Sequence, residues 1–506
     1  MPPQPIGRWK QKFLLSTLVS GLFLIYFSFS GCAVNPVTGK TQFMTVSEER
    51  EFSMGQQVDK QVREEMGFYL EDQELRSLVK EVGRSISQHT ARAKNLNYRF
   101  EIVDSPDFNA FALPGGFVYV QRGLLEKINS ADELASVLGH EITHVDARHS
   151  AAQISKVELL NIGLLAANIA TQGAVQQFGD LVNIGAVLTL NKFSRDAERE
   201  ADHYGTIYMT KAGYNPKASL DVMQQIQRIQ LREPTSVETW FMTHPPTSER
   251  LVNLNHEIGN IQQTQPAALN RPIKRNQYIR TLDGLAVGEW NGQELIRGDY
   301  YYNKEFLLKI KLPPGWQGQI NHKQYTAIFG QPKKDLYVMF NVEPLRIQKT
   351  SEEYFRDFEN KLGKSGLKKE GQTQQGFTQG ALKGTYKGSS GSLGAIQAVG
   401  FVFVNDVNGY SLLGISKTAD FQTFRPLVES MVQSLSFISQ KEAAELQPAR
   451  LKVHEVKGEE TWDSIMQKYF SSSQGKEKLA EYNGLEINQN PPAGILLKIP
   501  PTLHFQ

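Results

Sequence analysis

The sequence has a single cysteine, Cys32, among 506 residues, and this scarcity excludes two kinds of architecture. No disulfide can form within the chain, and no cysteine is available as a zinc ligand in a folded core. Neither sign of charge is in excess, because 55 Lys and Arg oppose 53 Asp and Glu and leave a formal net charge of +2. This balance gives no argument for binding nucleic acid or an anionic membrane surface. Any metal site must use histidine and carboxylate side chains.

Apolar runs that could cross a membrane are also scarce after the first thirty residues. Two apolar helical patterns lie between Val157 and Leu190, with breaks at Gln172-Gly173 and Gly179-Asp180. A membrane-spanning helix needs about 20 mostly apolar residues, and neither pattern is long enough or clean enough. The segment therefore predicts a soluble helical hairpin.

The first thirty residues are typical of a secretion signal. A positive region, Arg8 to Lys12, precedes an almost uninterrupted apolar run, Phe13 to Phe29, and then Ser30-Gly31-Cys32. The pattern resembles a bacterial lipoprotein signal, in which Cys32 would be lipidated and become the mature N-terminus. The alternative is an uncleaved membrane anchor, for which the run is slightly short. Both alternatives predict a protein outside the cytoplasm, and Ala33 after the cysteine favours, by resemblance, the outer membrane facing the periplasm.

One short stretch, His140-Glu141-Ile142-Thr143-His144, has the H-E-x-x-H spacing of a zinc site. Residues four apart on an α-helix lie almost above one another, so His140 and His144 can face one metal ion. Glu141 can take a proton from a metal-bound water. The alternative is a pair of ordinary core histidines. Ser130-Ala-Asp-Glu133 has the capping-box pattern and predicts that this helix begins there.

A second segment offers a third ligand. Ser194 is a suitable cap for a helix on which Glu198 and Asp202 lie four apart, on one face. Zinc on two histidines needs a third protein ligand and an open position for water, and Glu198 fits the ligand role. Asp202 fits as the acceptor that fixes the tautomer of a ligand histidine. Without the histidine motif, the segment would be an ordinary solvated acidic face.

Three motifs together resemble the M48 family of zinc metallopeptidases. They are HEITHVDARH, the Ser-Arg-x-x-Glu-x-x-Ala-Asp helix and Thr243-His244-Pro245-Pro246. The Asn-Ala-Phe-Ala-x-Pro-Gly-Gly and Cys-Ala-Val-Asn-Pro-Val-Thr-Gly stretches belong to the same pattern, which covers roughly residues 32 to 255 and is most similar to the soluble, lipoprotein or periplasmic branch. The resemblance implies one Zn²⁺ held by His140, His144 and Glu198, with Glu141 as the base, in a mainly helical zincin-like domain with a small sheet.

His244 extends the implied site. In this branch of the family the His-Pro-Pro histidine lies near the zinc on a loop, so His244 is a candidate fourth ligand that would shut out the catalytic water. Arg250 follows six residues later and can stabilise an oxyanion or form a structural ion pair. His149, His203 and His256 have no spacing that connects them with the site, and we expect them to be uninvolved.

The stretch Asn109 to Val120 is a candidate substrate strand. Pro114-Gly115-Gly116 is a turn signal, and Phe117 to Val120 is strand-like. Beside a metal helix, an edge strand can pair with an extended peptide, although a plain hairpin explains the pattern equally well. The candidate substrate-binding residues are Asn109, Phe111, Pro114, Gly115 and Gly116.

The chain changes character after residue 260. Ile261 to Gln277 and Ser439 to Arg450 are predicted linkers around an α+β domain at 278–438. Four stretches in this domain are strand-like: Phe306 to Leu312, Leu336 to Val342, Phe401 to Val404 and Tyr410 to Ile415. Thr350-Ser-Glu-Glu353 predicts a capped helix, and Asn408-Gly409 predicts a hairpin turn. The domain carries no catalytic constellation, so a binding module and a structural appendage are both open.

Residues 451–506 resemble a LysM module of the form βααβ. Val456 to Ile465 matches its opening strand and first helix, Leu479 to Leu485 the second helix, and Gly494 to Pro500 the closing strand. Such modules bind N-acetylglucosamine polymers, including peptidoglycan. Sugar binding and a LysM-like fold without it are equally open here.

The sequence therefore predicts a multidomain zinc endopeptidase of the bacterial cell envelope, with residues 1–31 as its signal and 32–260 as its peptidase domain. Resemblance and location imply misfolded or misassembled envelope proteins as substrates, and a lipid anchor at the membrane. Two rival functions are open: an envelope chaperone or assembly factor with a mostly closed zinc site, and a peptidoglycan-binding scaffold. No pattern indicates nucleic acid as a partner.

Overall fold

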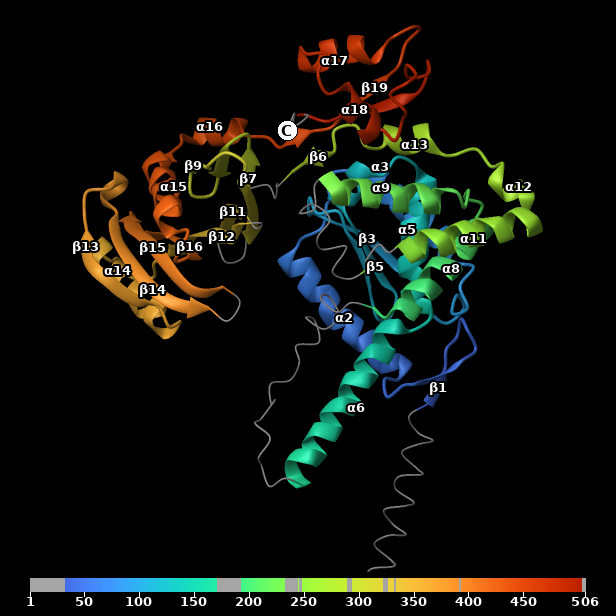
Figure 1. The fold of residues 1–506 in the computed structure, drawn as a ribbon, viewed down its shortest axis with the longest axis horizontal. Coiled ribbons are helices and arrows are strands. Elements are labelled where there is room, and N and C mark those ends of the chain that lie inside the picture. The colour runs from blue at the N-terminus through green and yellow to red at the C-terminus, as the bar shows by residue number, and fades with distance from the viewer. Residues whose placement is uncertain are drawn as a thin grey trace, which may run out of the picture. The chain divides into compact units, whose positions relative to one another are not determined.

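The computed structural model describes residues 32–170, 193–232, 244, 248–288, 294–321, 326–331, 334–390 and 393–502 (Figure 1). The chain forms two compact units that meet in sequence at Thr281 and Leu282, with residues 64–67 and 104–106 grouped with the second unit. The predicted signal segment and the second half of the predicted helical hairpin lie outside the described residues. Within the described ranges, no helix has the length and apolarity needed to cross a membrane.

The first unit contains a three-stranded sheet in the order β3-β5-β4, formed by Arg99–Val103, Phe117–Gln121 and Ala110–Leu113. β3 runs parallel to β5, and β4 runs antiparallel to it. Every residue of β5 is buried, as a strand with neighbours on both sides requires. The prediction that Phe117 to Val120 is an edge strand is therefore wrong, because β5 is central and the two edges of the sheet are β3 and β4.

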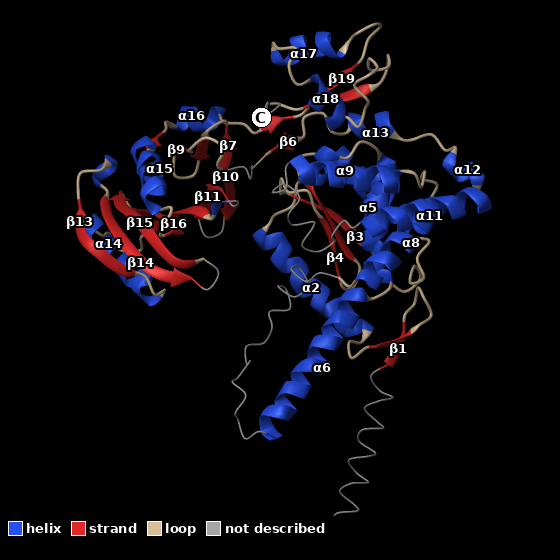
Figure 2. Cartoon of the chain, viewed as in Figure 1, coloured by secondary structure: helices blue, strands red, loops and turns tan. Residues whose placement is uncertain are grey.

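Helices make up most of this unit (Figure 2). They are α2 (Glu48–Glu65), α3 (Gln73–Ser87), α4 (Arg122–Lys127), α5 (Ala131–Asp146), α6 (His149–Ala170), α8 (Arg195–Lys211), α9 (Ala218–Arg232), α11 (Ser248–Thr264), α12 (Pro266–Leu269) and α13 (Arg275–Arg280). A short hairpin of β1 (Cys32–Val34) and β2 (Thr41–Phe43) precedes them.

Both predicted helix starts are confirmed. The hydroxyl oxygen of Ser130 accepts a hydrogen bond from the Glu133 amide at the start of α5, and that of Ser194 accepts one from the Ala197 amide at the start of α8. The Glu133 carboxylate accepts a bond from the backbone N–H of Asn129, one residue before the cap. The two helices that carry the motif residues are thus fixed at their N-termini by local sequence.

Two glycines let α5 and α8 approach closely. A methyl group added at Gly205 would lie 2.8 Å from the backbone nitrogen of His140, and one added at Gly139 would lie 2.8 Å from the Gly205 carbonyl oxygen. Real side chains do not tolerate contacts this short, so the crossing requires glycine on both helices. The close approach brings Glu198 and Asp202 of α8 beside His140 of α5.

Replacing Gly205 with alanine should therefore push these helices apart. We expect Gly205→Ala to lower the free energy of unfolding by about 1–3 kcal/mol, the usual cost of overpacking, as measured by urea denaturation. Gly259→Ala is the matched control, because Gly259 lies in α11 with nothing within 4 Å of an added methyl group. An unchanged unfolding midpoint for Gly205→Ala would contradict this account of the crossing.

The predicted linker at Ile261 to Gln277 is instead helical and packed. It forms the end of α11, all of α12 and the start of α13, where Ala268 and Leu269 are buried. The Asn215 side chain donates hydrogen bonds to the carbonyl oxygens of Leu269 and Arg271, at 3.2 and 2.8 Å. The Pro, Gln and Asn residues of this stretch serve helix ends and turns, so their presence did not mean a free linker.

The second unit contains a seven-stranded antiparallel sheet in the order β10-β11-β12-β16-β15-β14-β13. Its strands are β10 (Gln317–Asn321), β11 (Thr326–Gln331), β12 (Leu336–Pro344), β13 (Lys368–Gln374), β14 (Leu382–Ser390), β15 (Gly394–Asn405) and β16 (Asn408–Lys417). Helix α14 (Ser351–Lys364) packs on one face, and α15 (Phe421–Ser434) on the other. Thr350 forms the predicted capping box with Glu353.

A smaller sheet has the order β17-β9-β8-β7 (Ser436–Phe437, Leu308–Lys311, Tyr300–Asn303, Glu294–Arg297).

The predicted hairpin between β15 and β16 is present, but its turn is not Asn408-Gly409. Asn405 pairs with Asn408, so Asp406 and Val407 form the turn, and Asp406 takes the left-handed φ of 52°. Gly409 lies inside the strand, where an added methyl group would meet the Tyr354 ring at 2.5 Å. The glycine is therefore required for packing rather than for the turn.

The C-terminal segment has the predicted order of elements. β19 (Lys452–Glu455) and β20 (Leu496–Ile499) pair antiparallel, with α17 (Trp462–Phe470) and α18 (Lys476–Tyr482) between them in sequence. The second predicted linker is also structured, because α16 (Gln440–Glu445) is capped by Ser439 and β18 (Ala449–Arg450) pairs with β6 (Ala286–Val287). Assignment to the LysM family stays a prediction.

Candidate active site

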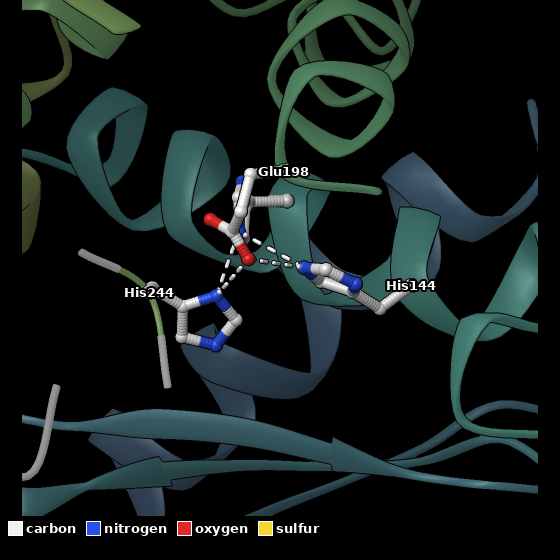
Figure 3. Close-up of side chains that lie close together, drawn as sticks. His144, Glu198 and His244 are labelled. Atoms are coloured by element: carbon white, nitrogen blue, oxygen red, sulfur yellow. Dashed lines mark hydrogen bonds and ion pairs between the residues drawn. The ribbon is translucent and has the colours of Figure 1, made fainter. Parts of the chain in front are cut away.

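Four side chains from distant parts of the first unit converge on one point. α5 contributes His140 and His144, α8 contributes Glu198, and His244 completes the group. All four are buried, and one candidate ligand atom from each lies within 4.8 Å of the others. Figure 3 shows the Glu198 carboxylate between the rings of His144 and His244. The predicted ligands are thus brought together, although the residues flanking His244 lie outside the described ranges.

The separations within this group suit a tetrahedral zinc site. Nε2 of His140 lies 3.1 Å from Nε2 of His144 and 3.2 Å from Nδ1 of His244. Glu198 oxygens lie 3.5 Å from the Nε2 atoms of His140 and His144 and 2.9 Å from Nδ1 of His244. Zinc bonds of about 2.1 Å would place neighbouring ligand atoms about 3.4 Å apart, so the donor set and its spacing fit zinc.

The charge state of Glu198 also suits a ligand. Its burial opposes ionisation, but the charge of His244 and the hydrogen bonds of His144 and His244 outweigh burial and hold the pKa of Glu198 well below its ordinary value. Burial lowers the pKa of His144, which keeps this imidazole neutral and able to bind a metal.

Glu141 lies beside the ligand group and is almost fully buried. Its Oε1 lies 3.4 Å from Nε2 of His244, and in the described part of the chain neither carboxylate oxygen has a hydrogen bond of good geometry. Burial raises the pKa of Glu141 above the usual value, against the opposing charges of His244 and His140. A carboxylate of raised basicity, held next to a candidate metal position, can accept and return a proton.

Asp202 and Arg250 support His140 from behind. Nδ1 of His140 lies 3.0 Å from Oδ1 of Asp202, and Arg250 donates to both Asp202 oxygens at 2.7 and 2.8 Å. Burial would raise the pKa of Asp202, but the Arg250 charge and hydrogen bonds hold it below the usual value. The carboxylate therefore fixes the His140 tautomer that turns Nε2 toward the ligand group.

Arg250 itself is engaged with carboxylates. Besides Asp202, its Nη1 lies 3.0 Å from Oε2 of Glu198, and the side chain is buried. These contacts support the ion-pair alternative for Arg250 over the role of oxyanion donor.

The prediction that His149 is uninvolved is wrong. Its Nδ1 lies 2.9 Å from Nδ1 of His144, and its Nε2 lies 3.2 Å from Oε2 of Glu200. Arg148 makes this possible, since its left-handed φ of 60° separates α5 from α6. No spacing rule could reveal His149, because a residue five positions along a continuous helix would face elsewhere.

Two other features concern residues around this group. Phe193, for which no sequence motif gives a signal, stacks on His144 with ring centroids 4.0 Å apart, and its ring centroid lies 5.7 Å from that of His244. His203 pairs with Glu257 at 2.7 Å, and His256 lies near Asn260 at 3.3 Å, so both are apart from the ligand group as expected.

Of the five candidate substrate-binding residues, only Phe111, on β4, is accessible to solvent. Phe111 is half-buried and stacks on Tyr119 with centroids 4.9 Å apart, whereas Asn109 is buried. Pro114, Gly115 and Gly116 form the predicted turn, but all three are buried, and a methyl group at Gly115 would meet the Phe52 Cα at 2.7 Å. The turn is therefore fixed by packing on α2, whereas the strand β4 packs beside α5.

Comparison with known proteins agrees with this geometry. The model of Peptidase family M48 matches residues 70–258. The mitochondrial metalloendopeptidase OMA1 of Schizosaccharomyces pombe is 30% identical over 267 residues, which cover 51% of this chain and 76% of that protein. The chain belongs to peptidase family M48.

Other M48 relatives match over a similar stretch. The mitochondrial metalloendopeptidase OMA1 of Bos taurus is 29% identical over 266 residues, and the β-barrel assembly-enhancing protease of Escherichia coli is 26% identical over 267 residues. The M48 chain spans about half the length of each, 50% and 54% respectively. Among solved structures, the cyanobacterial PsbP of Synechocystis is 12% identical with a TM-score of 0.23, covering 30% of this chain and 98% of that one. Likeness at that level carries no argument about the M48 chain.

Proposed function

We propose that the protein is a zinc-dependent endopeptidase that hydrolyses internal peptide bonds. The observation that carries the proposal is the convergence of His140, His144 and Glu198, buried and spaced for one zinc ion, with Glu141 beside them. Membership of a family of metalloendopeptidases supports the same reaction class. The test is zinc content together with chelator-sensitive cleavage of casein.

The residues divide the chemistry among them. Zinc, when bound, polarises the scissile carbonyl and lowers the pKa of a water molecule at the site. Glu141 accepts the water proton and passes it to the leaving amine, for which its raised pKa suits it. Asp202 holds His140 in one tautomer, and Arg250 keeps Asp202 charged. The edge strand β4 can align an extended peptide by main-chain hydrogen bonds.

The position of His244 makes the site closed. Its Nδ1 lies 2.9 Å from Glu198, its Nε2 lies 3.4 Å from Glu141, and its side chain is 2% exposed. One histidine thus occupies a ligand position and faces the base, where a catalytic water would have to lie. We propose that activity requires His244 to leave.

His244→Ala should therefore raise peptidase activity while zinc stays bound by the other three residues. We expect an increase of at least about tenfold in casein cleavage, equivalent to ~1.4 kcal/mol removed from an opening equilibrium. His203→Ala is the control, since His203 lies on α8 but pairs with Glu257. If His244→Ala keeps its zinc and is no more active than the parent, autoinhibition is refuted.

The location and substrate class are further proposals. Lipid attachment at Cys32 would anchor the protein in the cell envelope, at the outer membrane facing the periplasm, where misfolded or misassembled envelope proteins would be its substrates. Cys32 is exposed at the start of β1, as a modified residue must be. A relative named as a β-barrel assembly-enhancing protease supports this setting. Retention of membrane association by Cys32→Ser would count against the lipid anchor.

The closed site also favours a second candidate, an envelope chaperone or assembly factor that rarely cleaves. The specific observation is again the buried His244, because a protein that needs no catalysis has no need to release it. The Glu141→Gln variant separates this candidate from the peptidase.

A role for the C-terminal segment in peptidoglycan binding rests on its βααβ order and on its LysM-like sequence. If the segment binds sugar, the full chain should sediment with cell-wall sacculi, and a chain without residues 451–506 should sediment less. Equal sedimentation would remove the proposal of a peptidoglycan-binding scaffold.

A further inference from the structure

His144 is connected to the segment that follows Cys32 by a continuous series of polar contacts. Nδ1 of His144 lies 2.9 Å from Nδ1 of His149, and Nε2 of His149 lies 3.2 Å from Oε2 of Glu200. The same Glu200 oxygen accepts a hydrogen bond of 3.4 Å from Nδ2 of Asn35. His144, His149 and Asn35 are buried, and the Glu200 side chain is 22% exposed.

Only one arrangement of protons satisfies every contact when His144 binds a metal through Nε2. Nδ1 of His144 then carries the proton and donates to Nδ1 of His149. Since His149 accepts at Nδ1, its remaining proton is on Nε2, which donates to the Glu200 carboxylate. The series therefore runs in one direction, and each member fixes the tautomer of the one before it.

The outer end of the series is also held in place. Oδ1 of Asn35 accepts hydrogen bonds from the backbone amides of Val37 and Thr38, at 2.9 and 3.1 Å. With the amide oxygen committed to this turn, the Nδ2 group points toward Glu200. Glu200 thus receives donors from two sides, and its pKa is lowered chiefly by the hydrogen bond with His149.

The two ligand histidines of α5 have matching supports. His140 contacts the Asp202 carboxylate, which Arg250 of α11 holds. His144 reaches the Glu200 carboxylate through His149, and Asn35 holds Glu200. In both cases a carboxylate of α8 ends the series and is fixed by a donor from another segment. Such supports set the orientation and basicity of a metal ligand.

We propose that His149 and Glu200 are positioning residues for the ligand His144, with Asn35 fixing the outer end, so that the segment after Cys32 is part of the support of the metal site. The proposal rests on the proposed zinc-dependent function. It assigns roles to three residues that the H-E-x-x-H motif and the third ligand do not include.

The test measures the zinc dissociation constant of the purified full chain by competition with a chromophoric chelator. We expect His149→Phe, which keeps a planar ring but can neither accept nor donate a hydrogen bond, to weaken zinc binding by about 10- to 100-fold. Glu200→Ala should weaken it by about tenfold, and Glu200→Gln by less, because an amide oxygen still accepts the His149 bond. Asn35→Ala should have the smallest effect.

Two further readouts separate positioning from a general structural role. The absorption spectrum of the cobalt-substituted chain reports ligand geometry and should change in His149→Phe and Glu200→Ala. The melting temperature of the metal-free chain should change no more than in His203→Phe, the control for a histidine–carboxylate pair that joins α8 to α11 outside the site. The double variant His149→Phe/Glu200→Ala should bind zinc no more weakly than His149→Phe alone, because Glu200 acts through His149.

Zinc affinity and cobalt spectra equal to those of the parent in both His149→Phe and Glu200→Ala would overturn the proposal. Additive losses in the double variant would also overturn it, since Glu200 would then act independently of His149. If His149→Phe does not fold, the comparison of Glu200→Ala with Glu200→Gln decides. Failure of the parent chain itself to bind zinc would instead refute the proposed function.

Discussion

Replacing Glu141 with glutamine should leave zinc in place and lower peptide hydrolysis by about 10²- to 10⁴-fold, the usual contribution of a general base. Glutamine has almost the same shape but cannot accept the water proton. Glu141 lies beside the ligand group rather than within it, and its oxygens have no well-formed hydrogen bond in the described part of the chain. The loss should therefore fall on catalysis and leave metal binding and folding unchanged. Casein cleavage and zinc content, measured on the same sample, give both values.

The same variant separates the two candidate functions. If a cellular phenotype of the deleted gene is not restored by Glu141→Gln, proteolysis is the activity that matters. Full restoration by this variant would instead support the chaperone or assembly factor. Combining Glu141→Gln with His244→Ala removes the remaining ambiguity, because an opened site without its base should still be inactive if the enzyme is a peptidase.

The second large effect is expected for Glu198→Ala, which should lose the metal altogether. Glu198 is the one carboxylate in the ligand group, and its oxygens lie 2.9 to 3.5 Å from nitrogens of the three histidines. Its pKa lies well below the usual value, so the side chain is ionised. Without it, the site has no anionic ligand, and three buried imidazoles face one another. We expect zinc content to fall from one equivalent to near zero after dialysis, with loss of all measurable cleavage.

Glu257→Ala is the matched control for that experiment. Glu257 is also a buried glutamate paired with a histidine, but its partner His203 lies outside the ligand group. This control should keep its zinc. One equivalent of zinc retained by Glu198→Ala would show that Glu198 is not the third ligand.

Much of the site is encoded locally and could therefore be predicted from the sequence. The spacing of His140 and His144 on a helix, the serine caps of both helices and the four-residue register of Glu198 and Asp202 all depend on neighbouring residues alone. The structure brings these side chains together where α5 and α8 cross at Gly139 and Gly205. No sequence pattern predicts this contact.

The features that escaped prediction depend on long-range packing. His149 reaches His144 only because Arg148 takes a left-handed conformation, and Arg148 is held there by Glu51 and by the carbonyl oxygen of Val46, about one hundred residues earlier. The stretch at Ile261 to Gln277 has the composition of a linker, yet Ile261, Ala268 and Leu269 are buried within the peptidase unit. Strand order likewise follows from pairing partners, so β5 rather than β4 is central.

The most direct test of the central claim is the zinc content of the purified chain together with casein cleavage, with and without a chelator. The parent and His244→Ala should both be measured, because we propose that His244 closes the parent site. The account predicts one equivalent of zinc per chain and cleavage that a chelator abolishes and added zinc restores. A chain that binds no zinc, or that cleaves casein equally well after chelation, would contradict it.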